Sequence, residues 1–194
     1  MIATRARSLS ALTLLAAAAA FSLPAQAQHA GAHPFFGFGL TGGGEDLASF
    51  QFSNGTTSTV TTGGLLEFKG GVEMHLSGPL SARVSLGYHV DNTNASNGSF
   101  RFERFPLEGL VFWQGAPNFR LGGGLRQAMS PRASGTGVAS GSATFSADLG
   151  GVVEGEYFFN PRTSLYGRAV FETYKVSGIS LSGDHVGIGV NFYF

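Results

Sequence analysis

The chain contains no cysteine, which excludes disulfide scaffolds, thiol catalysis and cysteine-based zinc or iron–sulfur sites. Charge is also scarce, since 12% of the residues are charged against about 25% in an average soluble domain. Twelve Lys and Arg balance twelve Asp and Glu, so we expect no nucleic-acid partner. No run reaches the 18 apolar residues of a membrane-spanning helix, whereas glycine (30 residues) and aromatic residues (12%) are plentiful. This composition favours β architectures, in solution or in a membrane.

The N-terminal segment has the three parts of a secretory signal peptide. Arg5 and Arg7 precede an apolar run over 11–23, and Ala25-Gln26-Ala27 matches a small-residue cleavage site. The run is too short for the roughly 20 residues that span a bilayer. We therefore expect residues 1–27 to be removed after Ala27, with Ala25 and Ala27 directing cleavage, and residues 28–194 to form one exported domain.

Apolar residues alternate with polar residues or glycine along most of the remaining chain, which is the period of a β-strand. A change of parity near Glu103-Arg104 predicts a β-bulge there. Short turns at 77–79, 114–118 and 159–163 alternate with longer polar loops at 42–63, 92–99, 128–143 and 175–183, as in transmembrane barrels. The eight expected strands cover 36–40, 66–76, 82–90, 100–113, 119–125, 145–157, 165–171 and 186–194.

The last segment carries a strict apolar alternation that ends the sequence on phenylalanine. Its apolar positions are Val186, Ile188, Val190, Phe192 and Phe194. This ending resembles the C-terminal assembly signal of bacterial outer-membrane barrels. Together with the eight segments and the stretches 87–91, 97–98 and 105–108, it makes the chain similar to small barrels of the OmpA/OmpX type.

This resemblance implies an all-β fold, a single closed antiparallel transmembrane β-barrel of eight strands with short periplasmic turns and four longer extracellular loops. It also implies a monomer in the bacterial outer membrane, inserted by the barrel assembly machinery and surrounded by outer-membrane lipid and lipopolysaccharide. The loops would contact a partner that the sequence does not identify. Because this fold carries several different functions, the resemblance fixes no activity.

The interior predicted for such a barrel is charged. An eight-stranded lumen is just wide enough for side chains to fill it, and an unpaired buried charge costs several kcal/mol. Hairpins centred on Gly78 and Pro161 place residues of opposite sign on facing strands. The predicted lumen pairs are Glu73 with Arg83, Glu67 with His89, and Glu154 with Arg168. We expect a salt-bridged plug, in which exchanging Glu154 and Arg168 preserves much of the stability.

Two smaller features belong to the same prediction. Gly122-Gly123-Gly124 lacks the following helix of a phosphate loop and instead gives neighbouring side chains room in the lumen. Aromatic residues near the turns predict a girdle at the periplasmic interface. They are Trp113, Phe119, Tyr157, Phe192 and Phe194.

A catalytic reading rests on His89, Asp91 and Glu103. Outer-membrane lipid A deacylases use His, Ser and Glu, but the position two after His89 is an aspartate and not a serine. A polar network in the lumen is therefore the favoured interpretation. The five histidines have no metal-ligand spacing, so we expect neither a metal site nor a cofactor.

The sequence thus predicts a non-catalytic envelope protein that acts through its surface loops. Two alternatives stay open at this stage. One is an outer-leaflet hydrolase of lipid A or phospholipid with His89 as base, and the other is a narrow pore or a carrier of a small hydrophobic ligand.

Overall fold

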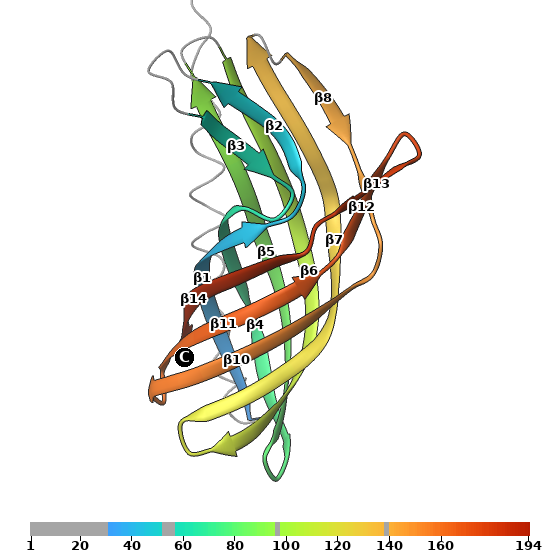
Figure 1. The fold of residues 1–194 in the computed structure, drawn as a ribbon. Helices are drawn as coiled ribbons and strands as arrows, with labels where there is room; N and C mark the ends of the chain where they lie inside the picture. Colours follow the sequence, from blue (N-terminus) through green and yellow to red (C-terminus); the bar gives the residue numbers. More distant parts are fainter. Residues whose placement is uncertain (1–30, 52–56, 96–97, 138–139) are drawn as a thin grey trace, which may run out of the picture.

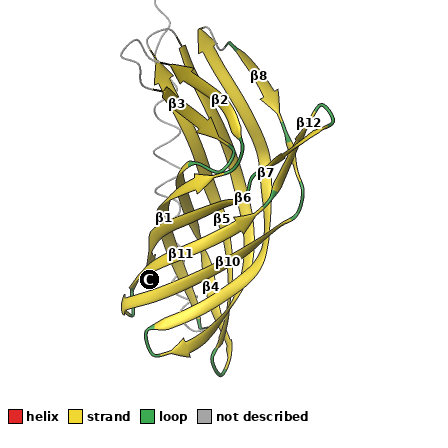
Figure 2. Cartoon of the chain, in the orientation of Figure 1, coloured by secondary structure: helices red, strands yellow, loops and turns green. Residues whose placement is uncertain are grey.

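The computed structural model describes residues 31–51, 57–95, 98–137 and 140–194, which form strands joined by turns and loops (Figures 1 and 2). The expected signal peptide, with Ala25 and Ala27, lies outside these residues. Within the described ranges, no helix has the length and apolar character needed to cross a membrane.

Eight antiparallel strands form a closed ring. The ring runs in the order β10, β11, β14, β1, β4, β5, β6, β7, and the pairing of β7 with β10 closes it. Each strand of the ring corresponds to one of the eight expected segments, so the barrel expected from the alternation is confirmed. The strands are β1 (Ala32–Gly43), β4 (Leu65–Ser77), β5 (Leu80–Ala95), β6 (Gly98–Ala116), β7 (Phe119–Gly137), β10 (Gly150–Asn160), β11 (Thr163–Phe171) and β14 (His185–Tyr193).

One end of the barrel, here called the turn end, carries the three short connections at 78–79, 117–118 and 161–162. The opposite loop end carries the long connections (Figure 1). Its additional strands are β2 (Asp46–Gln51), β3 (Thr57–Thr61), β8 (Gly141–Thr144), β9 (Ser146–Ala147), β12 (Thr173–Val176) and β13 (Ile179–Ser182).

The four longer connections expected at this end are confirmed, but their described residues are largely paired into strands. The segment 42–63 contains the β2–β3 hairpin, 92–99 continues β5 and β6, 128–143 continues β7 and adds β8, and 175–183 belongs to the β12–β13 hairpin. Pairing satisfies backbone donors and acceptors that a coil would leave to water.

The surface of the barrel is inverted relative to that of a soluble protein. Outward positions carry exposed apolar side chains such as Phe38, Val84, Leu107 and Leu125, while inward positions of β5, β6 and β7 carry buried charge. An apolar exterior of this extent is the surface that faces lipid in a transmembrane barrel. Exposed aromatic residues ring the turn end, as the girdle prediction requires: Trp113, Phe119, Tyr157, Phe159, Phe192 and Phe194.

A register shift between β6 and β7 does occur between Glu103 and Phe105, where the sequence predicts a bulge, but the extra residue belongs to β7 and not to β6. Glu103 faces Arg132 and Phe105 faces Met129, so one residue of β6 is opposite the pair 130–131 of β7. β6 keeps its alternation throughout, with Phe102 turned inward like Arg104. The apparent change of parity arose because Phe102 is an apolar residue on the inner face.

Phe102 belongs to an apolar cluster at the loop end, which we call the cap. The cap consists of Val60, Phe102, Ala128, Ala133, Phe145 and Tyr174. The rings of Phe145 and Tyr174 contact the Phe102 ring edge-on, at 5.5 and 5.4 Å between centroids. Phe145 was expected on the outer face of the sixth barrel strand. It is buried instead, because β10 begins only at Gly150 and Phe145 folds back into the cap.

Candidate functional site

Besides Asp91 near the loop end, the described inner face of the barrel gathers six carboxylates and six cations. Eleven of these side chains belong to buried residues, and the twelfth, Glu73, has 12% of its side chain exposed. Alternation along the strands directs all of them into the lumen. The carboxylates are Glu67, Glu73, Glu108, Glu154, Glu156 and Glu172, and the cations are Lys69, Arg83, Arg104, Arg120, Arg126 and Arg168.

The layer nearest the turn end is built around two arginines that share two carboxylates. Arg83 lies 3.0 Å from Glu73 and 2.8 Å from Glu156. Arg120 also pairs with Glu73, and it lies 2.7 Å from Glu156. The Tyr193 hydroxyl accepts a hydrogen bond from Arg120 at 2.8 Å and donates one to Glu156. Each charge in this layer therefore has at least two partners.

The two arginines of this layer both contact one aromatic ring. The guanidinium carbons of Arg83 and Arg120 lie 4.4 and 4.5 Å from the centroid of the Phe112 ring. Phe112 is fully buried beside Leu110, Val152 and Val170 on the inner face. Cation–π contact stabilises guanidinium groups that are withdrawn from water.

Glu154 occupies the centre of the lumen and connects the layers. Its carboxylate lies 2.9 Å from Lys69, 2.8 Å from Arg83 and 3.7 Å from Arg168. The register places Glu154 opposite Arg168, as the turn at Pro161 predicts. Its two shortest ion pairs nevertheless cross the lumen to β4 and β5, so Glu154 and Arg168 are not an isolated pair.

The layer toward the loop end has the same shared arrangement. Arg126 lies 2.9 Å from Glu67, 2.5 Å from Glu108 and 3.0 Å from Glu172. Arg168 lies 3.0 Å from Glu67 and 2.6 Å from Glu108. Two carboxylates thus bridge two arginines from β7 and β11.

The other two predicted pairs differ from each other. Glu73 lies opposite Arg83 and forms an ion pair with it. Glu67 lies opposite His89 in the register, but its ion pairs are with arginines. The His89 ring shares its shortest hydrogen bond, 2.7 Å, with the Thr41 hydroxyl.

The lumen meets the cap at Arg104. Its guanidinium is fully buried, 5.1 Å from the Phe102 ring centroid, and lies 3.8 Å from Glu172. Tyr174 of the cap donates a hydrogen bond of 2.6 Å to Glu172. The charged layers and the apolar cap therefore form one continuous filling between the turn end and the loop end.

The weak catalytic candidates are not brought together. His89 and Asp91 face inward and are buried, and Asp91 accepts a hydrogen bond of 2.8 Å from the Thr61 backbone, which fastens β3 to the barrel. Glu103 points to the outer face, where it lies 2.9 Å from Arg101. On β6 the even-numbered side chains, such as Phe102 and Arg104, face the lumen, so Glu103 points away from it. No group of three metal-ligating side chains occurs among the residues that the structure describes.

Sequence reasoning did not assign partners to most of the lumen charges. Lys69, Glu108, Arg120, Arg126 and Glu156 lie in the network without having been paired beforehand. Their alternation with lipid-facing residues already places them on the inner face. The partners of Lys69 and Glu156 lie on strands that no short turn joins to theirs, so the hairpin rule could not find them. Glu108 and Arg126 lie directly opposite each other on β6 and β7, and the same rule applied to the short turn at 117–118 would have paired them.

No family model and no curated protein matches the sequence. Solved structures do match. Neisserial surface protein A aligns at 14% identity with a TM-score of 0.53, over 84% of this chain and 97% of that one. Ail, the attachment invasion locus protein of Yersinia pestis, solved in complex with the heparin analogue sucrose octasulfate, aligns at 11% identity with a TM-score of 0.51, over the same shares. In fold, the chain is a small β-barrel of the kind found in bacterial outer membranes.

Proposed function

We propose that the protein is an integral outer-membrane component that acts through its extracellular surface and neither catalyses a reaction nor conducts solutes. The observation that carries this proposal is the filled lumen. Arg83, Arg104 and Arg126 are among the largest fully buried side chains, and each lies within 4 Å of a carboxylate.

The ion-paired side chains that fill the lumen oppose an aqueous path, because each charged group is held by its partners. A solute would have to separate ion pairs such as Arg83–Glu154, and breaking a buried pair leaves a charge uncompensated at a cost of about 3–5 kcal/mol. The cap adds an apolar barrier at the loop end. A carrier of a hydrophobic ligand would need an emptier and less charged interior.

The described residues of the loop end are held together by hydrogen bonds between its connections. Glu45 of the β1–β2 connection and Ser182 of β13 bond to each other, with backbone nitrogens donating in both directions at 3.1 Å. The Thr62 hydroxyl donates a 2.6 Å hydrogen bond to the Ser182 carbonyl. An ordered surface of this kind supports contact with an external partner, because little conformational freedom is lost on binding.

A conductance measurement tests the closed lumen. The purified chain, inserted into planar bilayers, is expected to leave the conductance at the level of a protein-free membrane. A steady voltage-driven current through single inserted barrels would contradict the proposal and favour a pore.

Lipid A profiling tests the absence of catalysis. Mass spectra of lipid A from cells with and without the protein are expected to be identical. A protein-dependent loss of an acyl chain that disappears in a His89→Ala variant would favour the hydrolase instead. Recovery of the chain in the soluble periplasmic fraction would refute the membrane location itself.

A further inference from the structure

The outward face of β5, β6 and β7 changes from apolar to charged near the loop end. Leu86, Phe105 and Met129 are the last exposed apolar side chains on this face before the change. The next outward positions are Glu103 of β6 and Arg132 of β7, which lie directly opposite each other.

Two arginines dominate this charged rim. Arg101 follows Glu103 on the outer face of β6, and its side chain is 49% exposed. The Arg101 guanidinium binds the Tyr88 hydroxyl and lies 2.9 Å from Glu103, so its direction is fixed. Arg132 is exposed, and among the described residues its side chain has neither an ion-pair nor a hydrogen-bond partner.

The two arginines are close enough to hold one anion. Arg101 faces Ser134 and Glu103 faces Arg132, so the two arginines occupy diagonal positions on neighbouring strands. Residues in such diagonal positions of an antiparallel pair are about 7–8 Å apart. Guanidinium groups bind phosphate through paired, charge-assisted hydrogen bonds. The one carboxylate beside them, Glu103, already accepts a hydrogen bond of 2.9 Å from Tyr88. Arg101, Arg132 and Glu103 together carry a net charge of one positive unit.

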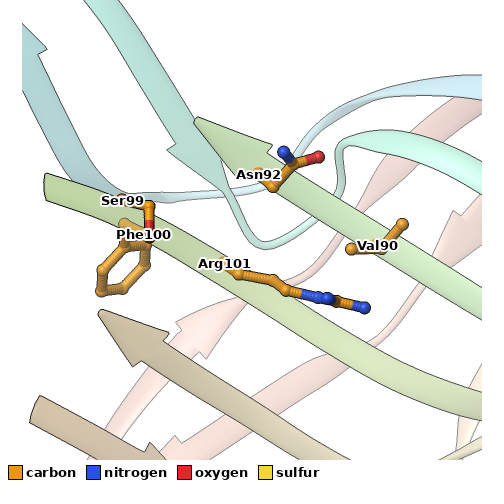
Figure 3. Close-up of a pocket in the computed structure, with 5 residues that line it drawn as sticks. All are labelled: Val90, Asn92, Ser99, Phe100 and Arg101. Carbon is orange, nitrogen blue, oxygen red and sulfur yellow. The ribbon is translucent and has the colours of Figure 1, made fainter. Parts of the chain in front are cut away.

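A pocket opens beside Arg101. It measures about 400 Å³ and is lined by Val90, Asn92, Ser99, Phe100 and Arg101 (Figure 3). In the register, Asn92 lies opposite Arg101. An amide, a hydroxyl and a guanidinium placed around apolar Val90 are the groups that recognise a hydroxylated ring carrying an anionic substituent.

The depth of the rim matches the headgroup region of a bilayer. Toward the loop end, Glu103 and Arg101 lie two and four residues beyond Phe105, and at the tilt of about 45° of a transmembrane strand this is about 5 and 9 Å along the membrane normal. The headgroup region of one leaflet begins where the hydrocarbon ends and is about 5–8 Å thick. A lipid whose acyl chains cover Leu86 and Phe105 would therefore carry its headgroup to the two arginines.

We propose that this rim binds the phosphorylated saccharide headgroup of an outer-leaflet lipopolysaccharide. Arg101 and Arg132 hold a phosphate, and Asn92 and Ser99 bind sugar hydroxyls in the adjacent pocket. The proposal depends on the proposed outer-membrane location only for the supply of this lipid, because binding is measured on the isolated barrel.

The test uses the purified full barrel in detergent, incubated with bisphosphorylated lipid A, dephosphorylated lipid A or phosphatidylglycerol, with retained lipid measured by native mass spectrometry. We expect bisphosphorylated lipid A to be retained about tenfold more than either other lipid. An Arg101→Gln/Arg132→Gln variant is expected to lose this preference, whereas Arg162→Gln, at an exposed position of the turn end, keeps it.

Folding is checked in each variant by the heat-dependent shift in gel mobility. Because Arg132 has no partner within the described chain, Arg132→Gln alone keeps the test valid even if the double variant assembles poorly. Equal retention of the three lipids, equal retention by wild type and Arg132→Gln, or an equal loss in Arg162→Gln would each overturn the proposal. Saturation by phosphatidylglycerol would show a site for any anionic lipid and would also overturn it. None of these outcomes bears on whether the lumen conducts.

Discussion

Replacing Glu154 by glutamine tests whether the lumen is a dry, charge-paired plug. The Glu154 side chain is completely buried, with Lys69 at 2.9 Å and Arg83 at 2.8 Å. Glutamine keeps the shape of the side chain and one acceptor, but it removes the charge and turns an amide donor toward two cations. Because a buried charge is left without its partner, we expect a loss of about 3–5 kcal/mol in the free energy of unfolding.

The matched control is Glu103→Gln, the same chemical change on the outer face. Glu103 is 29% exposed as a side chain and its partner Arg101 is 49% exposed, so solvent screens the pair. An exposed pair of this kind contributes about 1 kcal/mol or less. Both variants are unfolded by urea in lipid vesicles and followed by tryptophan fluorescence, since Trp113 lies in the exposed girdle.

The difference between the two variants decides the result. A gap of about 2 kcal/mol or more between Glu154→Gln and Glu103→Gln is expected from burial alone. If the two free energies of unfolding agree within about 1 kcal/mol, water reaches Glu154 and the filled lumen is refuted. The conductance experiment would then be expected to detect ions.

Three further predictions follow from the same contacts. The hairpin alone predicts that exchanging Glu154 and Arg168 preserves much of the stability, but the contacts of Glu154 across the lumen reverse this expectation. The exchange should destabilise the barrel more than Glu154→Gln in the same urea assay, because the new arginine would face two cations; recovery of stability would indicate an isolated pair. Phe194→Ser should lower the amount of assembled barrel in membranes. Tyr193→Phe loses the hydrogen bond to Glu156 and should instead lower the urea midpoint of unfolding. Reduced assembly of Tyr193→Phe together with normal assembly of Phe194→Ser would contradict both roles. Phe102→Ala should cost about 3–5 kcal/mol in unfolding because it empties the centre of the cap, and a loss below about 1 kcal/mol would show that the cap is loosely packed.

The ring of strands was predictable because a period of two and a short turn are local signals. The turn at Gly78 fixes Glu73 opposite Arg83, and the turn at Pro161 fixes Glu154 opposite Arg168, whatever the rest of the barrel does. The loop end was not predictable in this way. The polar composition of 42–63 and 175–183 gives no sign of strands, yet both segments form hairpins because their backbones pair and because Val60 and Leu181 pack into or against the cap.

The bulge shows how an apolar inner residue misleads a pattern. Phe102 was assigned to the outer face because it is a large apolar side chain, and the assignment forced a change of parity at Glu103. The cap creates an apolar environment on the inner face, so hydrophobicity there no longer distinguishes the two faces. The extra residue is at 130–131 of β7, where Ser130 has a φ of 49°.

Contacts across the lumen depend on which inward positions are glycine, and so leave space, as well as on which positions are charged. A β-carbon on Gly39 would lie 2.4 Å from the Tyr166 hydroxyl, and one on Gly122 would lie 2.4 Å from the Phe112 ring, so both positions require glycine. Tyr166 in turn places its ring 3.7 Å from the Lys69 ammonium, and the Phe112 ring contacts two arginines. The large and charged side chains thus occupy space that glycines on other strands leave open. A hairpin rule considers only two strands at a time, so it finds a partner within one hairpin, such as Arg83 for Glu73, but not the partners across the lumen. Predicting the partners from sequence would require the stagger of the whole ring, because only the stagger determines which glycine faces which long side chain.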